Sequence, residues 1–345
     1  MHTVYNERHK LHRTDGVLIE GYPLNSQEVP ARAEAILAAI RQAALGPVVA
    51  PVDHGLAPIL AVHDAEYVAF LREVYAESAG YFGEAGPVSV WTFASRHAMH
   101  KPANFLGRKG YYAFGWGSPI LEGTWQAAYW SAQCALTAAD LVREGGEDRR
   151  VAYALCRPPG HHAGPDLYGG YCYLNNAAIA ARHLQAGDER VAVLDVDYHH
   201  GNGTQLIFYD DPAVLFCSLH VDPDEDYPHY WGSAAETGRG PGLGTNRNWP
   251  LPRGTGDGAY LAALDEALAA IEAFLPATLV VSAGLDTVEG DPEGGFCLSA
   301  EGLGRVGRAI GRLGLPTVVV QEGGYLLNDL GRNALILLQA LVDER

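Results

Sequence analysis

The segment Val191-Ala-Val-Leu-Asp-Val-Asp-Tyr-His-His-Gly-Asn-Gly-Thr204 joins an apolar run to a dense group of polar side chains. Val191 to Leu194 has the apolar character of a buried parallel strand. Asp197 and His199 follow two residues apart, so an extended backbone would place both side chains on one face, where they could hold one metal ion. In an open α/β sheet, ligands bind at the carboxyl ends of the strands. An isolated Asp-x-His is weak evidence, because most such tripeptides are polar loops without a metal.

Three further apolar runs also end in side chains typical of catalytic sites. They are Val151–Leu155 before His161 and His162, Leu279–Val281 before Asp286, and Thr317–Gln321 before Tyr325. Because these runs alternate with segments of helical periodicity, the sequence predicts an open, mostly parallel sheet with helices on both faces. The four strand ends would then meet at one edge of the sheet.

The spacing of apolar residues predicts helices over seven segments. They are 30–45, 63–75, 124–143, 175–185, 257–274, 299–313 and 328–342. Two regions, 81–123 and 220–253, lack this periodicity, and we expect irregular loops there. Loops of this length in a compact enzyme usually shape a binding site. The chain has 345 residues and no linker-like stretch, so we expect one domain over residues 1–345.

Composition narrows the class of protein further. The formal net charge of −17 argues against binding to nucleic acid, whose phosphates such a surface repels. The five cysteines form no Cys-x-x-Cys pair. The sequence contains no charged-then-apolar leader at residues 1–16 and no apolar run long enough to span a membrane, so we expect a reduced, cytoplasmic protein without membrane contact.

These motifs resemble, in unbroken order over about residues 110 to 330, those of the histone deacetylase family, and are most similar to the bacterial acetylpolyamine amidohydrolases. The matching segments are 157–164, 169–176, 194–205, 218–220, 250–252, 254–256, 284–292 and 322–325. The resemblance implies the arginase/deacetylase fold. It also implies a metal-dependent amidohydrolase that removes an acyl group, in most cases acetyl, from a small N-acetylated amine.

Asp197, His199 and Asp286 would supply two carboxylates and one imidazole and leave coordination positions open, which is the pattern of a catalytic metal. Such oxygen and nitrogen ligands suit Zn²⁺, with Fe²⁺ as an alternative in cells. A bound ion of this kind polarises a carbonyl and lowers the pKa of a bound water to about 7. The resemblance further implies a structural K⁺ held by oxygen ligands from Asp195, Asp197, Ser218 and the backbone of His199 and Leu219.

The resemblance assigns roles to the other polar side chains. His162 would be the general base, and His161 an electrostatic partner held by Asp195. Asn202 stands where class I relatives have an aspartate, and this neutral partner should leave His162 less readily protonated. Tyr325 would donate its hydroxyl to the developing oxyanion. The walls of a narrow substrate channel would come from Gly170, Tyr171 and Tyr227.

Two rival functions remain to be weighed. Arginase-like chemistry shares the fold but needs two manganese ions and further carboxylates, at positions where this chain has Gly201 and Val288. A catalytically silent protein that binds acylated amines is the other rival, and retention of every catalytic side chain argues against it.

The substrate itself stays open. Acetylpolyamine amidohydrolases narrow the channel mouth with an inserted loop, often by dimerising, and place carboxylates near the distal ammonium groups. Region 81–123 corresponds to that loop, so we expect a homodimer that uses it. The positions that align with those carboxylates hold Val17, Leu106 and Gly117. A less cationic N-acetyl amine or an acetyl-lysine substrate is therefore the alternative to an acetylpolyamine.

Overall fold

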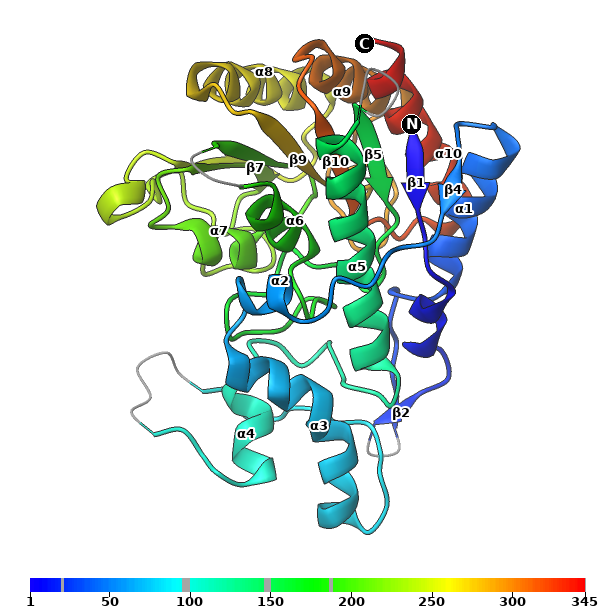
Figure 1. Cartoon of the computed structure of the whole chain (residues 1–345), viewed down its shortest axis with the longest axis vertical. Coiled ribbons are helices and arrows are strands. Elements are labelled where there is room, and N and C mark those ends of the chain that lie inside the picture. Colours follow the sequence, from blue (N-terminus) through cyan, green and yellow to red (C-terminus); the bar gives the residue numbers. More distant parts are fainter. Residues whose placement is uncertain (20–21, 95–99, 146–149, 186–188, 345) are drawn as a thin grey trace.

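The computed structural model describes residues 1–19, 22–94, 100–145, 150–185 and 189–344. One sheet of eight parallel strands, in the order β4-β1-β5-β10-β9-β6-β7-β8, runs through the molecule (Figure 1). Its strands are β1 (His2–Val4), β4 (Val48–Val49), β5 (Val151–Ala154), β6 (Val191–Asp195), β7 (Val214–Val221), β8 (Asn246–Leu251), β9 (Thr278–Ala283) and β10 (Thr317–Gln321). A short antiparallel ribbon, β2 (Leu18–Ile19) with β3 (Tyr22–Pro23), lies outside this sheet.

Helices cover both faces of the sheet. They are α1 (Ala31–Gln42), α2 (Ala57–Leu60), α3 (Ala65–Phe82), α4 (Phe105–Tyr111), α5 (Thr124–Arg143), α6 (Asn176–Leu184), α7 (Asn202–Phe208), α8 (Asp257–Phe274), α9 (Ala300–Arg312) and α10 (Leu327–Asp343). Along β6, Val191 and Val193 pack into one apolar cluster with α3, α5 and α6, whereas Ala192 and Leu194 pack into another with α1, α8, α9 and α10. The α/β prediction with two covered faces is therefore confirmed.

The predicted helices agree with the observed ones to within a few residues, except that α3 continues to Phe82 rather than ending at 75. Two regions predicted to be irregular contain regular elements, and there the prediction was wrong. Region 81–123 contains α4, whose two glycines weaken helical propensity and whose first turn is capped by the Asn104 side chain. Region 220–253 contains β8, a polar strand with Pro250 that the sheet accepts only because it forms an edge.

The four strands that lead into the chemical motifs are neighbours at the centre of the sheet. Their order is β5-β10-β9-β6, and every pairing among them is parallel. Their carboxyl ends therefore point to the same edge, where the following loops meet. None of the helices in the described ranges combines the length and apolar character needed to cross a membrane.

Candidate active site

Three side chains from the ends of β6 and β9 converge. Nδ1 of His199 lies 3.3 Å from Oδ1 of Asp197 and 3.3 Å from Oδ2 of Asp286. Backbone N–H groups of Gly323 and Tyr198 donate to the remaining oxygens of the two aspartates, at 2.8 and 3.0 Å. Oδ2 of Asp286 is buried and accepts no hydrogen bond from any described residue. The predicted ligand set is thus assembled, and its donor atoms fit a divalent metal ion.

Charges in this group favour a cation. Burial lowers the pKa of His199, but its contacts with Asp197 and Asp286 outweigh burial and raise that pKa to about 10. Burial, reinforced by the charge of Asp197, raises the pKa of Asp286 to about 7. Asp197 and Asp286 are buried carboxylates that repel each other when both are ionised. A divalent metal ion would offset both negative charges and would leave the imidazole of His199 neutral.

Two glycines make room for these carboxylates. A Cβ at Gly284 would overlap Oδ2 of Asp197, and a Cβ at Gly323 would overlap Oδ2 of Asp286. Only residues without a side chain fit at these positions, because the carboxylates approach the neighbouring backbone directly. The site therefore requires glycine at positions 284 and 323.

The histidine pair follows β5 and lies beside the metal-type group. Nδ1 of His161 is 3.0 Å from Oδ2 of Asp195, and Nδ1 of His162 is 2.7 Å from Oδ1 of Asn202. The two imidazole centroids are 4.0 Å apart. All four side chains are buried, and Nδ1 of each histidine has one side-chain hydrogen-bond partner.

The surroundings of the two imidazoles separate their pKa values. For His161, burial is outweighed by attraction to Asp197 and Asp195, which raises its pKa to about 10. For His162, burial and repulsion from His161 and His199 hold the pKa well below its usual value. One imidazole is thus held in the charged form and its neighbour in the neutral form.

Tyr325 lines the same cavity as the histidine pair and lies in the turn after β10. Its backbone N–H donates to Oδ2 of Asp291 at 2.6 Å, and the Arg32 guanidinium stacks 4.4 Å from the centre of its ring. Burial keeps the pKa of the Tyr325 hydroxyl well above 10, although Arg32 opposes this. The hydroxyl therefore stays protonated and available as a hydrogen-bond donor.

The three residues predicted to form the channel walls lie around one cavity. A cavity of about 480 Å³ is lined by His162, His199, Tyr325 and the three predicted wall residues. At Gly170, with φ +53°, a Cβ would strike the His162 ring and crowd the Tyr227 hydroxyl. Tyr171 and Tyr227 lie close to Tyr325 and His162, with ring centroids 5.8 and 5.1 Å apart respectively.

Sequence reasoning missed several residues near the cavity. Phe114 stacks on Tyr227 with centroids 6.0 Å apart, and Asp226 and Glu293 both line the cavity. Glu293 follows the matched segment 284–292 directly, and that position was the available signal. Phe114 lies in a region without periodicity, where the sequence offered none.

The three positions expected to replace rim carboxylates are dispersed. Gly117 lines the cavity, whereas Leu106 is an exposed residue of α4, and neither Leu106 nor Val17 is among the residues that line it. Of the residues expected to hold K⁺, Asp195 and Ser218 pair across β6 and β7, and Oδ1 of Asp195 accepts the N–H of Asp197 at 3.1 Å.

Arginase-like chemistry would need a further carboxylate at position 201, and the structure leaves no space for one there. A Cβ at Gly201 would overlap Oδ2 of Asp195. A carboxylate side chain does not fit there while Asp195 holds His161.

The fold and the arrangement at the strand ends define a class of enzyme. A family model described as the histone deacetylase domain matches residues 26–341. The chain belongs to the histone deacetylase family and is a hydrolytic deacetylase.

Individual relatives narrow the comparison. The chain is 47% identical over 343 residues to acetylpolyamine amidohydrolase 1 of Pseudomonas aeruginosa, covering 98% of each chain. It is 44% identical to acetylpolyamine amidohydrolase of Mycoplana ramosa, covering 99% of each. The crystal structure of acetylpolyamine aminohydrolase from Burkholderia pseudomallei superimposes with a TM-score of 0.92 at 43% identity, covering 100% of this chain and 99% of that one. The predicted family is therefore confirmed.

Proposed function

We propose that the protein is a zinc-dependent amidohydrolase that removes the acetyl group from a small N-acetylated amine of the polyamine type. The observation that carries this proposal is the convergence of three metal-type ligands, a histidine pair of opposite protonation preference and a protonated tyrosine around one cavity. The names of the relatives support the amine class of substrate.

Asp197, His199 and Asp286 would hold the zinc ion, with Fe²⁺ as the cellular alternative. Zinc held by these residues would polarise the scissile carbonyl and lower the pKa of a bound water to about 7. The set supplies three protein ligands, which leaves room for water and substrate as in other catalytic sites.

His162 would act as the general base. Because its Nδ1 faces the acceptor Oδ1 of Asn202, the Nδ1 position carries the proton and Nε2 is free to take one from the attacking water. The low pKa keeps this imidazole neutral at the start of the reaction. His162 then returns the proton to the leaving amine. His161, held by Asp195, would stabilise the negative charge that develops nearby.

The hydroxyl of Tyr325 would donate to the oxyanion as the carbonyl carbon becomes tetrahedral. Its rigid support by Asp291 and Arg32 fixes the donor before the reaction begins. Gly170, Tyr171 and Tyr227 would enclose the apolar methylene chain of the substrate between ring faces.

Glu293 is the residue that we propose to bind an ammonium group of a polyamine substrate. Burial raises the pKa of its carboxyl group. The Tyr171 hydroxyl is its only described side-chain hydrogen-bond partner, at 3.5 Å. Asp226, the other cavity carboxylate, instead accepts hydrogen bonds from Tyr198 and Arg253. An ammonium group of the substrate would supply the cation that Glu293 lacks.

A less cationic amine, or acetyl-lysine, is the second candidate. The observation that favours it is Gly117, which lines the cavity at a position where a rim carboxylate was expected. Exposed carboxylates of this kind contribute on the order of 1 kcal/mol each.

We also propose that Asp195, Asp197, His199, Ser218 and Leu219 hold a structural K⁺. A homodimer contact through region 81–123 would fit its exposed aromatic residues, Trp91, Phe93 and Trp116. Gly115, Trp116 and Gly117 line the cavity, so this region would also shape its mouth.

The test is acetate release from acetylputrescine, acetylspermidine, an acetyl-lysine peptide and neutral N-alkylacetamides, measured with zinc-loaded enzyme and with Asp286→Ala. We expect turnover of the acetylpolyamines and none with the variant. Two manganese equivalents together with urea release from arginine would contradict the proposal, and so would an absence of turnover on every acetylated amine.

A further inference from the structure

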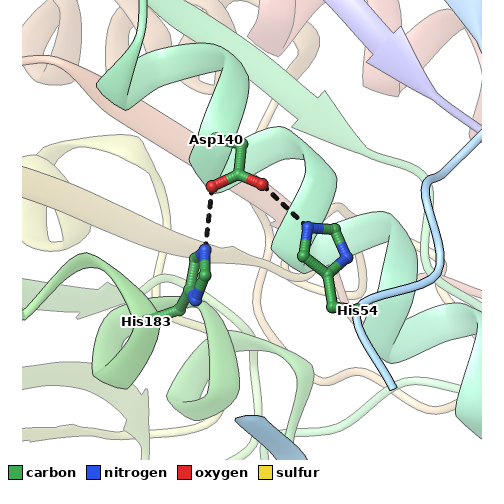
Figure 2. A group of neighbouring side chains, drawn as sticks. All are labelled: His54, Asp140 and His183. Carbon is green, nitrogen blue, oxygen red and sulfur yellow. Dashed lines mark hydrogen bonds and ion pairs between the residues drawn. The ribbon is translucent and has the colours of Figure 1, made fainter.

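A second group of metal-type side chains lies apart from the catalytic cavity. His54, from the segment between β4 and α2, meets Asp140 of α5 and His183 of α6 (Figure 2). Nε2 of His54 is 2.7 Å from Oδ2 of Asp140, and Nε2 of His183 is 2.8 Å from Oδ1 of the same carboxylate. None of the three side chains lines the catalytic cavity. The group therefore needs an explanation of its own.

The hydrogen bonds around His54 fix its tautomer. Its Nδ1 lies 3.1 Å from the Val52 carbonyl oxygen and 3.1 Å from Oε1 of Gln133. The Gln133 amide is oriented by two bonds, because Oε1 accepts the backbone N–H of His54 and Nε2 donates to the Gly55 carbonyl. Both neighbours of Nδ1 are thus acceptors, and Nδ1 must carry a proton.

This tautomer has a consequence at Nε2. In a neutral imidazole with a protonated Nδ1, Nε2 presents a lone pair, and here that lone pair would face a carboxylate oxygen at 2.7 Å. The contact is attractive only if a positive charge sits at Nε2, either a second proton or a metal ion. A metal-bound histidine typically donates its other N–H to a carbonyl oxygen, which is the arrangement His54 has.

We propose that His54, Asp140 and His183 form a second binding site for a divalent transition-metal ion, zinc above all, separate from the catalytic centre. Two imidazole nitrogens and a carboxylate, without cysteine, suit zinc as well as nickel and copper. The side chains are 13%, 25% and 20% exposed, so water can complete the coordination.

The charge balance fits one ion. Hydrogen bonds from the two histidines hold the pKa of the Asp140 carboxyl below its usual value against the effect of burial, so the carboxylate is ionised. Arg143 also donates to Oδ1 of Asp140. Protonating both histidines would add two further cations with ring centroids 5.7 Å apart, whereas a single divalent ion replaces both protons and leaves the imidazoles neutral.

The position of the site indicates a structural role. The ion would tie the segment before α2 to α5 and α6, two helices that pack against the same face of the sheet. Binding to the folded state alone would raise the melting temperature in proportion to the logarithm of the zinc concentration. Catalysis would not need it.

The experiment counts zinc. Five proteins are saturated with zinc, desalted and subjected to elemental analysis. They are wild type, His183→Ala, Asp286→Ala, the double variant of these two substitutions, and the control His100→Ala. His100 is exposed and belongs to neither group. We expect two zinc equivalents per chain in wild type and in His100→Ala. We expect one equivalent in each of the single variants His183→Ala and Asp286→Ala, and none in the double variant. Zinc should raise the melting temperature of Asp286→Ala, and the double variant should need at least tenfold more zinc for the same rise. His183→Ala should retain the deacetylase activity of wild type.

One equivalent in saturated wild type would overturn the proposal, and so would two equivalents retained by His183→Ala. Circular dichroism checks the fold of each variant. If His183→Ala does not fold, Asp140→Asn replaces it, with the same expected counts. A melting temperature of Asp286→Ala that does not respond to zinc would show that the three side chains form only a hydrogen-bonded network.

Discussion

Nδ1 of His162 lies 2.7 Å from the neutral amide oxygen of Asn202, whereas Nδ1 of His161 lies 3.0 Å from the carboxylate of Asp195. This single difference in partner contributes to pKa values on opposite sides of the ordinary histidine value. If His162 is the base, its pKa sets the lower pH limit of activity, and the residue at position 202 is one of the groups that determine this pKa.

Asn202→Asp should therefore move the acid limb of the kcat/KM profile to higher pH. The base must be neutral to accept a proton, and activity falls as pH drops through its pKa. A carboxylate at position 202 raises that pKa, and opposite charges at such distances typically shift a pKa by about 1 to 3 units. We expect a displacement of at least about one unit in the pH–rate profile measured with zinc-loaded enzyme.

The control is Asn333→Asp, a substitution at a residue of α10 that does not line the cavity and should leave the acid limb in place. An unchanged acid limb in Asn202→Asp, with normal zinc content, would mean that another group accepts the proton.

Tyr325→Phe should retain its zinc and its fold but lose about a hundredfold or more in kcat, the usual scale for removing an oxyanion donor. Steady-state kinetics with elemental analysis measures both. An effect confined to KM would show that the hydroxyl contributes only to ground-state binding.

His162→Ala should lower kcat at least as much as His161→Ala, because the proposed proton transfer uses the neutral imidazole of His162. Parallel kinetics of the two variants measure the order. The reverse order would mean that the two roles are exchanged.

Gly284→Ala should lose catalytic zinc, because its Cβ would overlap Oδ2 of Asp197 and displace a ligand. Overpacking of this kind costs typically about 1 to 3 kcal/mol, so the melting temperature should also fall. Gly258→Ala, whose Cβ meets no atom within 4 Å, is the matched control and should keep its zinc. Full zinc content in Gly284→Ala would show that the ligand carboxylate does not need this space.

The sequence predicted the central strands of the sheet and the polar segments that follow them, for a physical reason. Strands such as β6 are continuous apolar runs, and the polar residues that follow them stand at a sheet edge whatever the details of the loops. The family resemblance then supplied the roles that we propose for Tyr325 and Asn202, which no periodicity could assign.

The elements and cavity residues that the sequence did not predict depend on tertiary contacts. The short edge strand β8 and the glycine-containing helix α4 have weak local signals and form because neighbouring elements hold them. Glu293 lines the cavity from a loop, and Phe114 stacks on the cavity residue Tyr227 from another loop, so their positions follow from packing rather than from spacing. Three residues distant in sequence, His54, Asp140 and His183, likewise meet only after the helices have packed.

Glu293→Gln removes the negative charge of the cavity carboxylate that has no cationic side-chain partner among the described residues. We expect this variant to lose at least about tenfold in kcat/KM on acetylputrescine, equivalent to about 1.4 kcal/mol, and to keep its activity on a neutral N-alkylacetamide. Glu289→Gln, an exposed carboxylate on the same loop that does not line the cavity, is the control.

The most direct test of the proposed function is the ratio of kcat/KM for acetylputrescine to that for N-pentylacetamide, its neutral equivalent of the same length, measured by acetate release. We predict a ratio of about ten or more in wild type and in Glu289→Gln, and a ratio near one in Glu293→Gln. A ratio near one in wild type, or a ratio that Glu293→Gln leaves unchanged, would contradict recognition of a polyamine by this carboxylate.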